Sequence, residues 1–190
     1  MNTLNIFFQS YPLSITISTL LYGVISKRTF SLKLFGLLFF SINTNMLLKL
    51  GFQQFYKFIS KNDTIPILGK GSRPIQNLFC NSLFQTDNNG HKTKTFFKFF
   101  GMPSGHAQTS TVFFTSMTLY LLDNYGYNRQ TYLQILFLFV ITIGVTVSRV
   151  LNDCHTIQQT IVGNIIGVLI GYYGYQFIKS TNSDKKINYS

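Results

Sequence analysis

The sequence predicts an all-α fold, a membrane-embedded bundle of about five transmembrane helices. Only 11% of the 190 residues are charged and 46% are hydrophobic, whereas an ordinary soluble domain has roughly 25% charged residues. The charges are also unevenly placed. Five runs contain no Lys, Arg, Asp or Glu, namely residues 5–26, 34–48, 99–122, 130–148 and 156–178. Most of them approach the ~20 residues that an α-helix needs to cross a hydrocarbon core.

The first run, 5–26, is expected to stay as a helix rather than to be a cleaved signal peptide, because no basic residue precedes it. The second run, 34–48, is short. Lys33 and Lys49 flank it, however, and their aliphatic stems could extend to the interfaces and lengthen the span. The polar segment 51–98, with its prolines and an Asp-Asn-Asn-Gly turn, is expected to be a re-entrant or surface loop.

Length predicts one domain, which we place at residues 1–178, followed by a polar tail at 179–190 that is expected to fray.

The net charge of +11 with only five acidic residues disfavours an enzyme built on Mg²⁺ or Ca²⁺, which need carboxylates. A nucleic-acid partner is not expected, because the basic residues are scattered rather than gathered on one element. The sequence makes no prediction of an oligomeric state.

Cys80 and Cys154 lack the C-x-x-C spacing of a zinc or redox site. We expect neither cysteine to be catalytic. A disulfide between them is not the leading expectation, because two loop cysteines carry no geometric information, although an oxidising lumen would permit one.

Three short polar clusters interrupt the apolar background. If the helices cross alternately, all three fall on the same face of the membrane. They are Arg73-Pro74, then Gly101-Met102-Pro103-Ser104-Gly105-His106, then Ser148-Arg149 with His155 after five intervening residues.

The chemistry of these clusters suits a phosphate. Two guanidinium groups, on Arg73 and Arg149, offer planar pairs of donors that match phosphate oxygens. Ser104 and Gly105 open a helix, so their backbone N–H groups also favour an anion. A histidine can act as nucleophile or as acid near neutral pH. Each residue alone has an ordinary structural alternative, a membrane anchor or a helix start, but ionisable groups are costly at membrane helix ends unless they are paired or used.

The order Arg-Pro, Pro-Ser-Gly-His, Ser-Arg-x5-His resembles the signature of the type 2 phosphatidic acid phosphatase superfamily, over roughly residues 45–171. Within that superfamily, Gly-Met-Pro-Ser-Gly-His-Ala-Gln at 101–108 and His-Thr-Ile-Gln-Gln at 155–159 are similar to the dolichyl diphosphatase branch. The resemblance implies removal of a phosphate from a lipid diphosphate at the lumenal face of the endoplasmic reticulum, with no metal and no cofactor.

The resemblance also implies a role for each matching residue. His155 would attack phosphorus and become phosphohistidine, and His106 would protonate the leaving oxygen and then activate water. Arg73 and Arg149 would hold the phosphoryl oxygens, with help from Ser104 and the Gly105 N–H.

Two positions depart from the superfamily pattern. The lysine expected shortly before Arg73 is missing, since Pro66 and Ile67 stand there. Lys49 resembles it in context, with an insertion between, and Lys70 is the rival. Gln159 stands one helical turn after His155, where many relatives have Asp. Its side chain can orient the imidazole without adding a charge.

The leading hypothesis is a membrane phosphatase that hydrolyses a polyisoprenyl (dolichyl) diphosphate. The alternatives are a phosphatase for phosphatidic acid or another lipid monophosphate, and a non-catalytic protein that binds anionic lipid with a decayed site.

Basic residues in short segments opposite the catalytic face predict that this opposite face is cytosolic. Asn62-Asp63-Thr64, on the catalytic face, is then an expected N-glycosylation acceptor.

Overall fold

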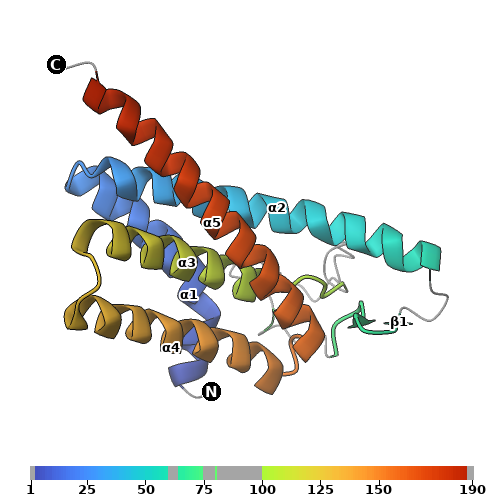
Figure 1. Cartoon of the computed structure of the whole chain (residues 1–190). Helices are drawn as coiled ribbons and strands as arrows, with labels where there is room; N and C mark the ends of the chain where they lie inside the picture. Colours follow the sequence, from blue (N-terminus) through green and yellow to red (C-terminus); the bar gives the residue numbers. More distant parts are fainter. Residues whose placement is uncertain (1–2, 60–63, 75–79, 81–99, 188–190) are drawn as a thin grey trace, which may run out of the picture.

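The computed structural model describes residues 3–59, 64–74, 80 and 100–187. These residues form an all-α bundle, as the sequence predicts, with one short hairpin beside it (Figure 1). The helices are α1 (Thr3–Ile25), α2 (Thr29–Ile59), α3 (Gly105–Tyr125), α4 (Arg129–Leu151) and α5 (Ile157–Ile187). The strands β1 (Thr64–Ile65) and β2 (Gly69–Lys70) pair antiparallel.

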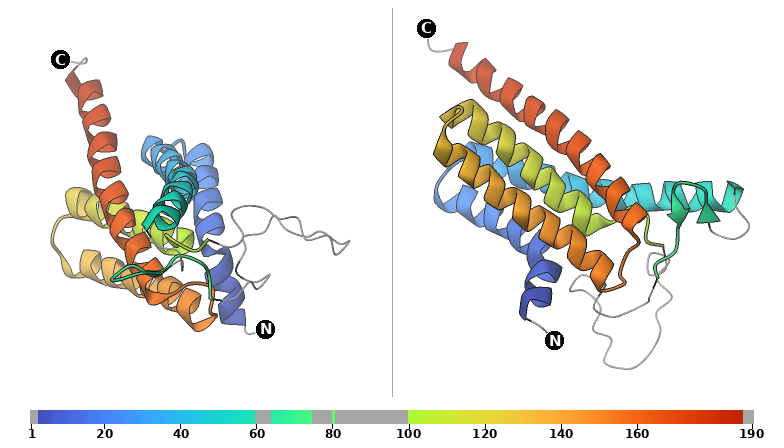
Figure 2. Two further views of the ribbon diagram at one scale, coloured as in Figure 1. Left: turned by 90° about the vertical axis from the view of Figure 1, so that its right-hand side faces the viewer. Right: turned by 60° about the horizontal axis from the view of Figure 1, so that its bottom comes forward.

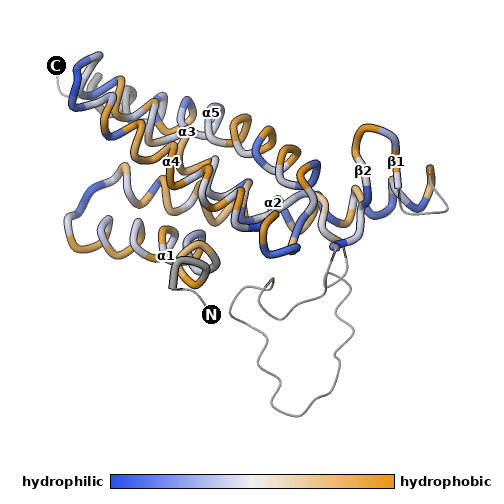
Figure 3. Tube along the Cα trace, turned by 90° about the horizontal axis from the view of Figure 1, so that it is seen from below, coloured by the Kyte–Doolittle hydropathy of each residue, from blue (hydrophilic) through white to orange (hydrophobic). Residues whose placement is uncertain are grey.

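Three helices, α2, α4 and α5, are long and apolar enough to cross a membrane, and α1 has a shorter apolar stretch at Ser10–Ile25. In the tube view, hydrophobic segments fill much of the helices and hydrophilic segments recur at their ends (Figure 3). The helix α3 packs against α2, α4 and α5, and its buried residues are largely polar, with Gln108, Thr109 and Ser110 among them. A helix surrounded by others can carry such residues, which lowers its hydropathy. That α1 and α3 also span the membrane stays a prediction.

Among the described helices, α3 and α5 have the most extensive contact, which runs along glycines spaced four residues apart on α5. A Cβ on Gly163 would lie 2.6 Å from the carbonyl oxygen of Ser104, and one on Gly167 would lie 2.6 Å from that of Gln108. A Cβ on Gly171 would lie 2.8 Å from Thr115 Cβ. Small residues at this spacing let two membrane helices approach backbone to backbone. The start of α3 is therefore held directly against α5.

The segment predicted as one long loop, 51–98, begins in fact as helix, because α2 continues to Ile59 and projects beyond the other helices (Figures 1 and 2). The hairpin then lies beside this projection, with the Tyr56 hydroxyl donating to the Gly69 carbonyl at 3.2 Å. Tyr56, Phe100 and Met102 form a buried apolar cluster beneath it. This packing explains why the polar composition of residues 51–98 wrongly predicted a loop at its start. The projecting end of α2 buries one apolar side against the hairpin.

At the other end of the chain, α5 continues to Ile187. The segment 179–190 therefore begins as a continuation of this helix, and that its end frays stays a prediction. Lys179 pairs there with Asp123 of α3 at 2.7 Å, and Tyr175 donates to the same carboxylate at 2.7 Å. These contacts tie α5 to α3 at the end of the apolar run. The division of the chain at residue 178 stays a prediction.

Candidate active site

The turn between α4 and α5 sets the distance between Arg149 and His155. Arg149 lies in the last turn of α4, and its carbonyl accepts from the backbone N–H groups of Cys154 at 3.0 Å and His155 at 3.1 Å. Asp153 makes the reversal with a φ of 52°, a left-handed conformation that Asp tolerates better than most residues. The spacing of Arg149 and His155 in sequence is therefore converted into a fixed contact in space.

His155 is buried and its ring is held by Gln159, one turn into α5. The imidazole Nδ1 lies 3.0 Å from Gln159 Oε1. The same oxygen accepts from the Thr156 backbone N–H at 3.3 Å. The predicted contact between residues 155 and 159 is thus present.

The amide nitrogen of Gln159 fixes which way its side chain points. Nε2 lies 2.8 Å from the carbonyl oxygen of Lys70, 3.2 Å from that of Gly71 and 2.9 Å from that of Ser72. An amide facing these carbonyls must present its NH₂ to them, so Oε1 faces His155 as an acceptor. The ring proton then sits on Nδ1, and Nε2 of His155 keeps its lone pair.

Gln159 also connects the three motifs. It anchors residues 70–72, which lead into Arg73, and its own carbonyl accepts from the Ser104 N–H at 3.0 Å. Gly101 packs so closely on the Gln159 amide that a Cβ there would collide with it. One buried glutamine therefore contacts the second and third clusters and the residues that directly precede the first.

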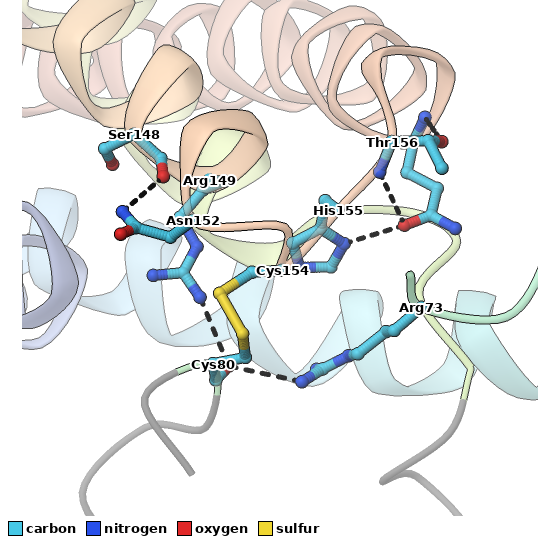
Figure 4. The surroundings of a disulfide bond; sticks show 9 residues. Arg73, Cys80, Ser148, Arg149, Asn152, Cys154, His155 and Thr156 are labelled. Atoms are coloured by element: carbon cyan, nitrogen blue, oxygen red, sulfur yellow. Dashed lines mark hydrogen bonds between the residues drawn. A yellow bond between two sulfur atoms is a disulfide. The ribbon is translucent and has the colours of Figure 1, made fainter. Parts of the chain in front are cut away.

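Arg73 and Arg149 converge on one oxygen, the carbonyl of Cys80, each at 3.2 Å (Figure 4). Cys80 forms a disulfide with Cys154, with a Cα–Cα separation of 5.2 Å. This bridge was a possibility in the sequence but not the leading expectation, and the structure contains it. The turn that buries His155 also directs Cys154 toward the arginines, and spacing in the sequence does not reveal this.

The start of α3 lies against the same region. Ser104 is the residue before α3, its side chain makes no capping bond, and its buried Oγ has no hydrogen-bond partner among the described residues. Arg149 Nε is likewise buried without a partner there. Buried donors are normally satisfied, so these two atoms are donors that a ligand with acceptor oxygens could satisfy. Gly105 is close-packed, since a Cβ on it would lie 2.9 Å from Asn45 Oδ1.

Asn45 and Gln108 support this helix start, a role that was not predicted from the sequence. The Asn45 amide donates to Gln108 Oε1 at 2.8 Å, and Gln108 Nε2 donates to the Ser41 carbonyl at 2.9 Å. Both side chains are buried. Their presence inside apolar runs was the available signal, because a buried amide is costly unless it is fully hydrogen-bonded.

Lys49 lies on α2 near the arginines and His155, close enough to interact electrostatically with all three. Lys70, the alternative to Lys49, is exposed on the hairpin. The contact of Lys70 with Gln159 is made by the Lys70 backbone carbonyl. His106 lies in the first turn of α3, partly buried, and its carbonyl accepts from Ser110 Oγ at 2.8 Å. The structure therefore brings Lys49, rather than Lys70, to the predicted cluster.

The surroundings of His155 keep its imidazole neutral. Burial is the largest cause that holds its pKa well below the ordinary value, and the charges of Arg73, Lys49 and Arg149 act in the same direction. The hydrogen bond to Gln159 acts in the opposite direction and is the smaller effect. A neutral ring with a defined tautomer, beside Arg73, Arg149 and Lys49, can attack an electrophile that these side chains bind.

Comparison with known families agrees with this geometry. The sequence pattern of the PAP2 superfamily matches residues 32–183. The chain belongs to the PAP2 superfamily. The matched range includes Lys49, Arg73, Ser104, His106, Arg149 and His155, together with Gln159.

Among curated members, the chain is similar to Dolichyldiphosphatase 1 of Dictyostelium discoideum, with 35% identity over 83 residues. The alignment covers 42% of this chain and 36% of that relative, so it spans little more than a third of the relative's length. No solved structure matches the chain.

Proposed function

We propose that this PAP2 protein is a membrane phosphatase that hydrolyses a polyisoprenyl (dolichyl) diphosphate to the monophosphate and inorganic phosphate. The observation that carries the proposal is the neutral His155, oriented by Gln159, beside two converging arginines. The name of the similar Dictyostelium protein supports the diphosphate as substrate. The apolar helices support a substrate that resides in the membrane.

In the proposed reaction, Nε2 of His155 attacks the terminal phosphorus. An N–P bond forms, and the bond from phosphorus to the bridging oxygen breaks. His106 donates a proton to that oxygen as the lipid monophosphate leaves. His106 then takes a proton from water, whose oxygen attacks phosphohistidine and releases phosphate and free His155. One water is consumed for each phosphate released.

The cations are proposed to stabilise the transition state. Arg73, Arg149 and Lys49 would bind the phosphoryl oxygens, whose charge changes as the bonds to phosphorus form and break. Ser104 Oγ and the Gly105 N–H would complete the contacts at the start of α3. The proposal needs no metal, because side chains supply the positive charge.

Gln159 does not argue for a decayed site. A carboxylate there would face the three carbonyls of residues 70–72, which an amide NH₂ satisfies. The glutamine therefore orients the ring and holds the Arg73 segment at once. This favours catalysis over the alternative of a non-catalytic protein that binds anionic lipid.

The test is phosphate release by purified protein in detergent with EDTA present. Dolichyl diphosphate, dolichyl monophosphate and phosphatidate would be compared at equal surface concentration. We expect the diphosphate to have the highest kcat/KM, and His155→Ala to abolish release. Gln158→Ala is a matched control, since Gln158 is exposed beside the buried Gln159. Preference for phosphatidate would support the monophosphate alternative, and no release from any substrate would support the non-catalytic one.

We propose further that the site faces the lumen of the endoplasmic reticulum. Residues of the site gather at one end of the bundle, and Asn62, which lies outside the described residues, follows α2 at that end in the chain. Expression in eukaryotic cells should allow a glycan at Asn62 and none at Asn188. A glycan on an extended C-terminal tail would show the reverse orientation.

A further inference from the structure

The disulfide between Cys80 and Cys154 lies within the site rather than at the edge of the fold. Cys154 directly precedes His155, and both sulfur-bearing residues are buried, Cys80 at 2% exposed and Cys154 at 0%. The bond closes a sequence separation of 74 residues. It attaches Cys80 covalently to the turn that carries His155.

The carbonyl oxygen of Cys80 is the acceptor that the two arginines share (Figure 4). Arg73 follows β2, whereas Arg149 lies in the last turn of α4, so the two guanidinium groups belong to different elements. Two like charges at close range repel. A shared acceptor between them offsets that repulsion and makes them converge when no phosphate is bound.

This contact leaves donors available to a ligand. The carbonyl takes a terminal nitrogen of each arginine, Nη1 of Arg73 and Nη2 of Arg149. Arg149 Nε stays buried without a partner among the described residues, as does Ser104 Oγ. The Cys80 carbonyl therefore accepts from one terminal nitrogen of each arginine and leaves Nε of Arg149 as a donor for phosphate oxygens.

We propose that the disulfide is a positioning device for phosphate binding: it holds the Cys80 carbonyl where both arginines must converge, so that the oxidised protein binds phosphate more tightly than the reduced protein. This rests on the proposed function. Cys80 and Cys154 are positioning residues, because they act through Arg73 and Arg149. Without the bond, the hydrogen bonds from Arg73 and Arg149 are the contacts shown by the described residues that would keep Cys80 at the arginines.

The chemical change is a thiol–disulfide exchange. A dithiol such as dithiothreitol gives two electrons and two protons, the S–S bond of the protein breaks, and two thiols form. The dithiol itself becomes a cyclic disulfide. Because the bond is buried, reduction is verified by the mass shift that maleimide adds to each free thiol.

The experiment compares oxidised, reduced and reoxidised wild-type protein in detergent. The readouts are KM and kcat for the diphosphate, and the inhibition constant of inorganic phosphate. We expect reduction to raise KM and the inhibition constant at least tenfold, to change kcat less than threefold, and to be reversed by reoxidation. The double variant Cys80→Ser, Cys154→Ser should resemble the reduced protein and should not respond to dithiothreitol.

Three outcomes would overturn the proposal. Unchanged constants in protein shown to be reduced would mean that the bond does not position the arginines. Tighter phosphate binding after reduction would mean that the carbonyl competes with phosphate. A melting temperature that falls below the assay temperature in both the reduced protein and the double variant would mean that the bond serves the whole fold.

Failure of the proposed function gives a different pattern. Oxidised protein that binds phosphate in a redox-dependent way but hydrolyses no lipid would keep the positioning role and remove the phosphatase. Oxidised protein that neither binds phosphate nor hydrolyses lipid would remove both.

Discussion

Gln159 Oε1 accepts a hydrogen bond from His155 Nδ1 at 3.0 Å, while the other end of the same amide lies against the carbonyls of residues 70–72. An amide can do both because it has an acceptor at one end and donors at the other. A carboxylate, with acceptors only, could orient the ring but would be repelled by those carbonyls. A glutamine at this position therefore satisfies both the imidazole N–H and the carbonyls of residues 70–72, which a carboxylate could not do.

Gln159→Glu tests this relationship with a side chain of nearly equal size. The new carboxylate should stabilise the charged imidazole and raise the pKa of His155, moving the acid limb of kcat/KM to higher pH. It should also lose the contacts to residues 70–72, displace Arg73 and lower kcat/KM by about 10²-fold, as expected for about 2.7 kcal/mol of lost transition-state stabilisation. Gln158→Glu is the control. An unchanged acid limb and rate would show that residues 155 and 159 are not coupled.

Lys49 and Lys70 can be separated by removing each charge while keeping a long side chain. Lys49→Met should raise KM by roughly 10- to 100-fold, the range for one lost charge-assisted hydrogen bond, because Lys49 lies with the arginines. Lys70→Met should change KM less than about twofold, because its side chain is exposed. Steady-state kinetics on the diphosphate measures both. A larger effect at Lys70 would contradict the placement of Lys49.

Gly163→Ala tests the close approach of α5 to the start of α3. Its Cβ would lie 2.6 Å from the Ser104 carbonyl oxygen, so the helices must separate, at a cost of about 1–3 kcal/mol. We expect a lower melting temperature in detergent and a lower kcat, since Ser104 and His106 move away from His155. Gly36→Ala is the matched control, because a Cβ there meets nothing within 4 Å. Equal behaviour of the two variants would argue against the contact.

The neutral state of His155 predicts how stability depends on pH. In the unfolded chain its pKa is about 6.5, and in the folded protein burial and nearby cations hold the pKa well below that value. Below pH ~6.5 the unfolded state therefore binds more protons, so stability falls as the pH falls. The contribution of this one group approaches about 1.4 kcal/mol per pH unit at most.

Melting temperatures measured in detergent between about pH 5 and 8 would detect this dependence. His155→Gln carries no titrating group, so its melting temperature should fall less steeply below pH ~6.5. Parallel curves for the two proteins would show that His155 is not held neutral by its surroundings.

Much of the site could be predicted because its residues lie in short, recognisable clusters. Arg149 and His155 are joined by one turn, and the contact of residues 155 and 159 follows from helical spacing. The bundle was predictable from the placement of charge. What could not be predicted depends on chain segments that return from a distance.

Lys49 is the clearest example. In sequence, Lys49 is far from Arg73, but α2 continues past it and the hairpin leads the chain back to the candidate site. The disulfide and the Asn45–Gln108 contact have the same character, since both join residues far apart in sequence. The glycines on α5 are visible in the sequence, but which helix they face is decided only by packing.

The length of α2 has a consequence for how a lipid reaches the site. At 1.5 Å per residue, Lys49 lies about 30 Å along the helix from Thr29, which is close to the thickness of a hydrocarbon core. With the start of α2 at one boundary of the bilayer, Lys49 stands at the other, and the remaining turns to Ile59 rise above it. In the proposed reaction, the phosphate would be met at the depth where lipid headgroups reside. A membrane lipid could then reach the site by lateral diffusion, with its tail still dissolved among neighbouring acyl chains.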